Sequence, residues 1–117
     1  MTPFEALASM VEPLTEAAAG LGLSVSTRPF GNVDPPALVF GAPILEWGAY
    51  DTTPSNASCP IYLVVAKTDM ALENLLRLAP SVGAVIEESI NAAVLRVQPV
   101  NHATLGPAYE FTVEVAL

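Results

Sequence analysis

The feature that most constrains the fold is the strict alternation of residues 109–117, YEFTVEVAL. Every odd position in this segment is apolar, and the even positions include the acidic residues Glu110 and Glu114. A period of two that is kept over the whole segment predicts a β-strand with one buried face. We therefore expect a sheet in which the odd side chains of this strand pack on the core and the two carboxylates point away from it.

Two amphipathic segments predict helices that cover the buried face of that sheet. In the first, residues 2–22, Thr2 and Glu5 are placed to form a capping box, and an apolar stripe begins at Phe4. Because this stripe keeps its phase across Pro13, we expect a kink there rather than a break.

The second amphipathic segment spans residues 69–90, with apolar side chains at helical spacing from Leu72 through Leu76 onward. Pro80 should bend or divide this helix, because proline removes a backbone donor. Strands are predicted at residues 23–28, 37–40, 59–67, 92–100 and 109–117. The order α-β-β-β-α-β-β predicts a single α+β domain, residues 1–117, with a mainly antiparallel sheet of four to five strands and two helices packed on one face.

Residues 41–58 are predicted to form a long irregular loop, because they show no sustained period. The loop holds four large apolar side chains, which are Ile44, Leu45, Trp47 and Tyr50. One interpretation is that Trp47 and Tyr50 fold back over an open edge of the core. The other is that the group anchors a contact with another subunit or another protein, since aromatic side chains are enriched at the centres of interfaces. We favour the interface.

The composition indicates a chain that covers part of its surface with a partner. Hydrophobic residues make up 52% of the 117 residues, charged residues only 14%, and the mean hydropathy is +0.49. A core of this size cannot hold so much apolar surface, so we expect self-association. The net charge of −8 argues against a tight nucleic-acid binder, because such proteins neutralise phosphates with Lys and Arg. The longest apolar run, residues 61–66, is too short to span a membrane, so no membrane contact is expected.

The sequence predicts no catalytic, metal-binding or cofactor-binding residues, so we expect a protein that is not an enzyme. His102 is the only histidine, and no second histidine supports a metal site. Cys59, the only cysteine, excludes an intramolecular disulfide and has no evident base beside it. Glu110 and Glu114 would lie about 14 Å apart along one strand, which is too far for a pair of catalytic carboxylates. A small α+β ligand-binding domain or enzyme is the alternative from a different class.

With these segments in order, the chain resembles the tail terminator proteins of long-tailed, siphovirus-type phages, particularly those that infect actinobacteria. An N-terminal helix leads into an alternating strand, and the strand PPALVFGAP is followed by a long loop and the strand CPIYLVVAKTD. The helix MALENLLRLAPSVGAVIEESI comes next, and the terminal pair AAVLRVQPV and AYEFTVEVAL closes the chain. The order of these features, which span nearly the whole chain, carries the resemblance.

The resemblance implies a structural protein of the virion. Tail terminators form a ring, usually a hexamer, on the head-proximal end of the tail tube, where they end tube polymerisation and join the tail to the neck. The implied partners are further copies of the chain, the tail tube protein and a neck or head-completion protein. The implied location is the virion tail or neck, and the host cytoplasm during assembly.

DNA passes transiently and without sequence preference through the channel of such a ring. On this reading Glu110 and Glu114 face the channel or the solvent, and an ordinary solvated sheet face is the alternative. The nearest alternative functions are another neck component or a tail-tube subunit.

Overall fold

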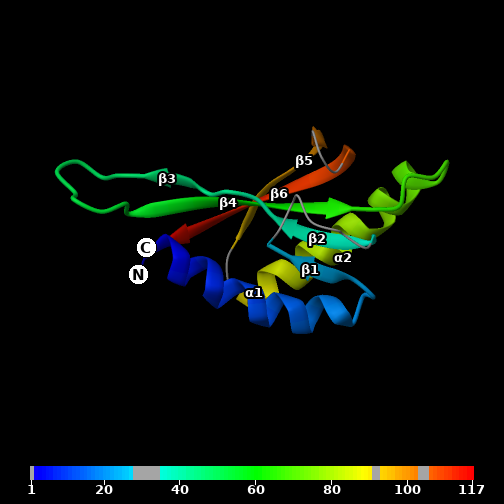
Figure 1. Cartoon of the computed structure of the whole chain (residues 1–117), viewed down its shortest axis with the longest axis horizontal. Helices are drawn as coiled ribbons and strands as arrows, with labels where there is room; N and C mark the ends of the chain where they lie inside the picture. Colours follow the sequence, from blue (N-terminus) through cyan, green and yellow to red (C-terminus); the bar gives the residue numbers. More distant parts are fainter. Residues whose placement is uncertain (1, 28–34, 91–92, 103–105) are drawn as a thin grey trace.

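The computed structural model describes residues 2–27, 35–90, 93–102 and 106–117. In these ranges the chain forms two helices and six strands (Figure 1). In chain order they are α1 (Pro3–Ala19), β1 (Ser24–Ser26), β2 (Ala37–Phe40), β3 (Ile44–Glu46), β4 (Asn56–Val64), α2 (Ala71–Ile90), β5 (Val94–His102) and β6 (Gly106–Ala116). Neither helix within these ranges has the length and apolar character that a membrane crossing requires.

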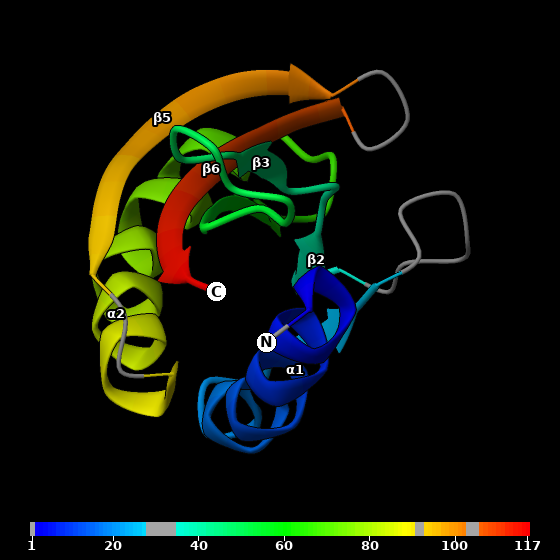
Figure 2. The same cartoon turned by 90° about the vertical axis from the view of Figure 1, so that its left-hand side faces the viewer.

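The strands form one sheet in the order β1-β2-β4-β6-β5, and β3 pairs with the same edge of β4 as β2. Strand β1 runs parallel to β2, and the other pairs are antiparallel. Both helices lie on one face of the sheet (Figure 1), and Figure 2 shows the sheet curved around them as an arch. The predicted α+β class, with a mainly antiparallel sheet and two helices on one face, is confirmed, and the sheet has six strands rather than four to five.

Helix α1 begins as the sequence predicts. The Glu5 N–H donates to Thr2 Oγ1 at 3.1 Å and the Thr2 N–H donates to Glu5 Oε1 at 3.4 Å, which completes the capping box. The helix continues through Pro13 and buries one stripe of side chains, which are Ala6, Met10, Leu14 and Ala18. Phe4, predicted to begin this stripe, is instead 78% exposed, because it lies outside the buried stripe in the first turn of the helix.

A bend or a division was predicted at Pro80; helix α2 is continuous from Ala71 to Ile90, so a division does not occur. Pro80 is exposed, and the carbonyl that loses its helical donor can bind water there. The buried side chains of α2 are Leu75, Val82 and Ile86. Leu72 and Leu76 were predicted to lie on its apolar face. They are 64% and 54% exposed, because they lie on a different side of the helix from the buried residues.

The larger of two buried clusters lies between the helices and the sheet, and the smaller one, Val39, Val64 and Ala108, lies on the opposite side of the sheet. Ile61 of β4 belongs to the same buried cluster as Leu14 of α1 and Ile86 of α2. The odd-numbered β6 residues Phe111 and Val113 are fully buried in this cluster, as the alternation predicts. The even-numbered residues of β4 and β6 lie on the opposite side of the sheet, called the open face below.

The predicted irregular loop at residues 41–58 is wrong in part. Ile44–Glu46 forms strand β3, and β4 begins at Asn56, before the predicted start of that strand. Strand β3 is too short to show a period in the sequence, and its stability comes from pairing with a distant segment of the chain. Two residues of predicted strands, 28 and 92, lie outside the described residues.

Candidate functional site: a projecting hairpin and the open face of the sheet

Strand β3 and the start of β4 form a hairpin that projects from one end of the molecule (Figure 1). Next to the last pair of the hairpin, the Ser55 N–H donates to the Glu46 carbonyl at 2.8 Å. The Leu117 N–H donates to the Ser55 carbonyl at 2.9 Å, so the end of the chain ties down the base of the hairpin. Residues 47–54, called the hairpin tip below, extend beyond the part of β4 that pairs with β6.

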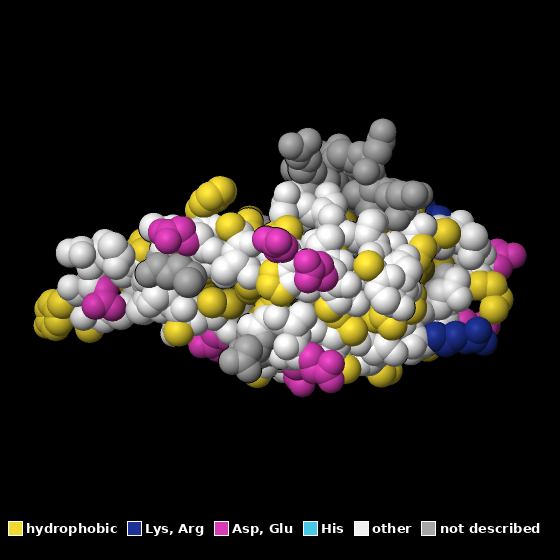
Figure 3. All heavy atoms as spheres, turned by 90° about the horizontal axis from the view of Figure 1, so that it is seen from below, with side chains coloured by type: hydrophobic (Ala, Val, Ile, Leu, Met, Phe, Trp, Pro, Cys, Tyr) yellow, Lys and Arg dark blue, Asp and Glu magenta, His cyan; other side chains and the backbone are white. Residues whose placement is uncertain are grey.

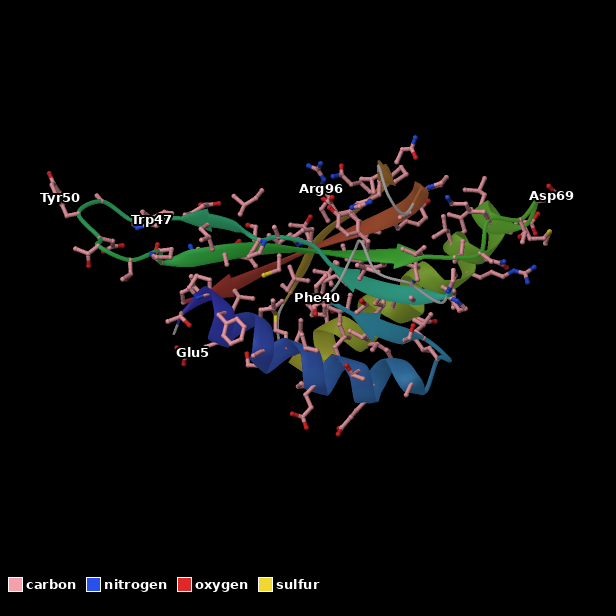
Figure 4. The ribbon with its side chains drawn as sticks, in the orientation of Figure 1. Glu5, Phe40, Trp47, Tyr50, Asp69 and Arg96 are labelled. Atoms are coloured by element: carbon pink, nitrogen blue, oxygen red, sulfur yellow. The ribbon has the colours of Figure 1, made fainter. Side chains whose placement is uncertain are left out.

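The hairpin tip contains a turn that presents Tyr50 outward. The Asp51 N–H donates to the Gly48 carbonyl at 3.2 Å, and the Gly48 N–H donates to Asp51 Oδ2 at 3.1 Å. Tyr50 has φ of 66°, in the left-handed region that a bulky residue avoids, and its side chain is 104% exposed (Figure 4). Backbone strain of this kind costs about 1–3 kcal/mol and is concentrated at functional sites.

The structure separates the four apolar residues predicted to form an interface. Ile44, Trp47 and Tyr50 are exposed, with Trp47 at 55% and Tyr50 at the tip (Figure 4). Leu45 packs against the main core and supports the hairpin from inside. The interpretation that both aromatic side chains cover an open core edge is wrong for Tyr50, whose side chain is fully exposed.

Glu110 and Glu114 both lie on the open face, but their surroundings differ. Glu110 is partly buried and lies opposite Tyr62 in the register of β4 and β6. Its carboxylate accepts a hydrogen bond from Gln98 Nε2 at 3.2 Å. Arg96 in turn donates to Gln98 Oε1, so a polar network links β5 and β6 beside Tyr62 of β4. Glu114 is exposed and lies opposite Ser58.

Sequence reasoning missed Tyr62, which lies opposite Glu110 beside this network. Its ring packs edge-to-face on His102, with 5.1 Å between ring centroids and 69° between the planes. Burial raises the pKa of Tyr62, and the charge of the Glu110 carboxylate raises it further. Tyr62 lies at an even position of its predicted strand. Its position opposite Glu110 follows only from the pairing register of β4 and β6, which the sequence does not reveal.

A shallow hollow of about 200 Å³ lies between the open face and the hairpin base. Ile44, Pro60, Tyr62, Glu110 and Thr112 line it, together with two smaller residues. The Glu110 carboxylate in this lining accepts a hydrogen bond from Gln98 Nε2 and so links β6 to β5.

The described surroundings of Cys59 and of the acidic residue Glu87 do not indicate a reactive site. Cys59 is 2% exposed, and burial raises the pKa of its thiol, which opposes thiolate formation. Glu87 accepts a hydrogen bond from the Val94 N–H at 3.4 Å and so links α2 to β5. Among the described residues, no group of three or more His, Cys, Asp or Glu side chains is placed to hold a metal ion.

Large apolar side chains are exposed in three further places within the described ranges. Phe4 lies at the start of α1, and two more lie on β5, which are Leu95 and Val97. A third group lies at the start of α2 and comprises Met70, Leu72 and Leu76. Figure 3 shows acidic side chains scattered over the helical side of the molecule, with apolar side chains between them.

Comparisons of the chain with protein-family models, with curated proteins and with solved structures give no match. A function therefore has to be argued from the residues and the geometry above. The exposed hairpin and the open face with its polar network are the two surfaces from which to argue it.

Proposed function

We propose that this chain is a structural assembly protein rather than an enzyme, and that it forms the ring that terminates a phage tail tube. One observation carries the proposal: a hairpin tied down at its base projects Trp47 and Tyr50 away from the fold. Exposed aromatic side chains on a supported element are typical anchors of protein–protein contacts. The sequence resemblance to tail terminators supplies the kind of assembly.

Exposed apolar surface supports self-association as the first step of assembly. The described residues expose large apolar side chains on the hairpin, at the start of α2 and along β5. A single copy in water would leave these surfaces hydrated at a cost of about 25 cal/mol per Å² of apolar area. Contacts between copies, or with tail tube and neck proteins, would remove that cost.

The unlike surfaces of one copy support a ring. When a contact joins two different patches, a pair of copies still has one free patch of each kind. Further copies can therefore be added until the contacts close into a ring, or without end as a filament. A terminator needs the closed form, since it has to stop growth, and the head-proximal surface of the ring would then receive the neck.

The open face supplies a candidate lining for the channel of that ring. Glu114 is exposed there, whereas Glu110 is held in the polar network. An acidic lining fits the passage of DNA, because Lys and Arg contacts would retain its phosphates. Glu114 is therefore the stronger candidate of the two for a residue that faces DNA.

A tail-tube subunit is the alternative that the same observation favours, because a projecting hairpin also suits stacked rings. Electron microscopy of a polymerising tail-tube protein, with and without this protein, separates the two functions. Termination predicts shorter tubes with one ring at one end. Unregulated tube extension would exclude termination, and incorporation along the tube would assign the chain as a tube subunit.

A further inference from the structure

Strands β2 and β3 pair with the same edge of β4, but their registers differ by one residue. The pairing with β2 ends at Phe40 opposite Ile61, and the pairing with β3 begins at Ile44 opposite Ser58. Residues 41–43 of the connection therefore face two residues of β4, which is the arrangement of a β-bulge. The interruption makes β2 and β3 two separate pairing units on one edge.

Two prolines remove the hydrogen bonds that could bridge this interruption. The Gly41 N–H donates to the Pro60 carbonyl at 2.9 Å, but Pro60 has no N–H for the return bond. Because the backbone groups of a strand point alternately to its two neighbours, those of Cys59 point toward β6 instead. Pro43, on the other side of the gap, also lacks an N–H. Between the two pairing units, the edge of β4 therefore offers no backbone donor.

Residues 42–54, called the strap below, are anchored at both ends. At one end Gly41 is bonded to the Pro60 carbonyl, and at the other the Leu117 N–H donates to the Ser55 carbonyl at 2.9 Å. Between these anchors, the three residue pairs of β3 and the hydrogen bond from the Ser55 N–H to the Glu46 carbonyl hold the strap along β4. On its other edge, β4 pairs with β6 over its whole length without a change of register. The strap can therefore leave β4 without disturbing the rest of the sheet.

The strap has little buried surface to oppose its release. Its large side chains at Ile44, Trp47 and Tyr50 are exposed, and Leu45 is the described strap residue that packs against the main core. Strand β2 is different, because all of its residues are buried. Segments with few buried apolar contacts and solvent-exposed hydrogen bonds open at a small fraction of the free energy of global unfolding. The strap is such a segment, and β2 is not.

We propose that the strap is a conformational device that releases from the edge of β4 as one unit, while β2, β4 and β6 stay paired. Release carries Trp47 and Tyr50 away from the sheet on a segment that is anchored at both ends. It also uncovers the backbone groups of Asn56 and Ser58, since these point toward β3. The inference goes beyond the proposed function, because it holds for a single copy and needs neither a ring nor a tail tube.

Amide hydrogen exchange followed by NMR tests the release within one strand. The amides of Ser58 and Tyr62 face the same edge of β4, with Ser58 opposite β3 and Tyr62 opposite β2, whereas the Cys59 amide faces β6. Once intrinsic rates are allowed for, we expect the Ser58 amide to exchange at least 100-fold faster than the other two. Equal protection of the three amides would overturn the proposal, because β3 would then open only with the whole sheet.

Deletion of Ala42 tests whether the change of register permits the release. Ala42 is exposed, and its removal leaves two residues facing two, so that β2 and β3 can form one continuous strand. We expect the ratio of Ser58 to Tyr62 exchange rates to fall at least tenfold. Deletion of Thr53 is the matched control, because it shortens the exposed hairpin tip by one residue and should leave the ratio unchanged. An unchanged ratio in folded protein lacking Ala42 would overturn the proposal.

The denaturant dependence of exchange in the parent chain decides the question if the deletion variant does not fold. Local release exposes little surface, so Ser58 exchange should hardly change at low denaturant concentrations, whereas Tyr62 and Cys59 exchange should rise steeply. The same steep dependence at all three amides would overturn the proposal. These results are independent of the tail-tube assay. A strap that stays closed would leave termination standing, and tubes that grow freely would leave the strap standing.

Discussion

Tyr62 and Glu110 lie directly opposite each other on β4 and β6, and the charge of the Glu110 carboxylate helps to raise the pKa of Tyr62. Gln98 on β5 donates a hydrogen bond to the same carboxylate, so Glu110 interacts with residues of both strands that flank β6. This arrangement explains why the two glutamates of one alternating strand have different surroundings. Glu110 has partners on both neighbouring strands, whereas Glu114 is exposed.

The first prediction concerns the ionisation of Tyr62. Glu110→Gln should lower the pKa of Tyr62 toward its ordinary value of 10.0, because it removes a negative charge that opposes formation of the phenolate. The shift should be partial, since burial is the larger cause of the raised pKa and remains in the variant. Ultraviolet titration of phenolate absorbance measures the change, with Tyr62→Phe identifying the component that belongs to this residue.

The same shift predicts how stability depends on pH. Tyr62 has a higher pKa in the folded chain than its ordinary value, so its contribution is fully present below pH 10 and is lost as the pH rises through the folded pKa. Denaturant unfolding at a series of alkaline pH values should show a smaller loss of stability in Tyr62→Phe than in the parent chain. An identical alkaline loss in both proteins would contradict this assignment.

The second prediction concerns Gly41, which follows β2 and approaches β4 closely. A Cβ at this position would lie 2.8 Å from Tyr62 Cε2 and 2.9 Å from Pro60 Cγ, both closer than real contacts allow. The Tyr62 ring is restrained, because it packs on His102. We therefore expect Gly41→Ala to destabilise the chain by about 1–3 kcal/mol, measured by denaturant unfolding.

The third prediction is the opposite effect of the same substitution at Gly83. Gly83 lies inside α2, and an added Cβ would be 3.8 Å from Phe111 Cε2, which is an ordinary contact. Alanine stabilises a helix interior by roughly 0.5–1 kcal/mol relative to glycine. Gly83→Ala should therefore raise the free energy of unfolding by up to this amount, and a loss of stability would mean that the space beside Gly83 is more tightly filled than described.

The fold could be predicted from the sequence where a pattern is local and long. The alternation of β6 identified Phe111 and Val113 as core residues, and the capping box of Thr2 and Glu5 identified the start of α1. Strand β3 could not be predicted, because it has three residues and depends on pairing with β4.

The candidate site was predictable only in part, for the same physical reason. The surplus of apolar residues in 41–58 pointed to the hairpin, including Trp47 and Tyr50. The polar network around Glu110 depends on the register between distant strands, and a shift by one residue would turn its side chain to the other face. The exposure of Leu76 on α2 depends on which side of the helix meets the sheet. Helical periodicity alone does not decide whether that side is the one with Leu76 or the one with Leu75, Val82 and Ile86.

The fourth prediction separates stability from assembly at the hairpin tip. Tyr50→Asn should leave stability unchanged or raise it by about 1 kcal/mol, because asparagine tolerates a φ of 66° better than tyrosine does. The same variant should weaken self-association, since it removes a large exposed aromatic side chain from the tip. Thermal unfolding and sedimentation velocity measure the two effects.

Trp47→Ala provides the companion variant, because Trp47 is 55% exposed and its loss should leave the core intact. We expect weaker assembly with little change in unfolding. Assembly that is unaffected by both variants would remove the hairpin tip from the interface, whereas a loss of folding in both would mean that the tip supports the fold instead.

The last prediction concerns the acidic open face and the passage of DNA. Glu114 is exposed, so Glu114→Lys reverses a charge there without breaking the network around Glu110. If the open face lines the channel, a lysine in every copy of the ring would attract phosphates, and DNA release from assembled particles should slow several-fold. The effect should diminish as salt is raised, because screening weakens contacts between exposed charges.

Glu16→Lys on α1 makes the same charge change on the helical side of the sheet and should leave release unchanged. Normal release from Glu114→Lys particles with fully assembled tails would assign the open face to ordinary solvent, and equal slowing by both variants would point to net charge rather than to position.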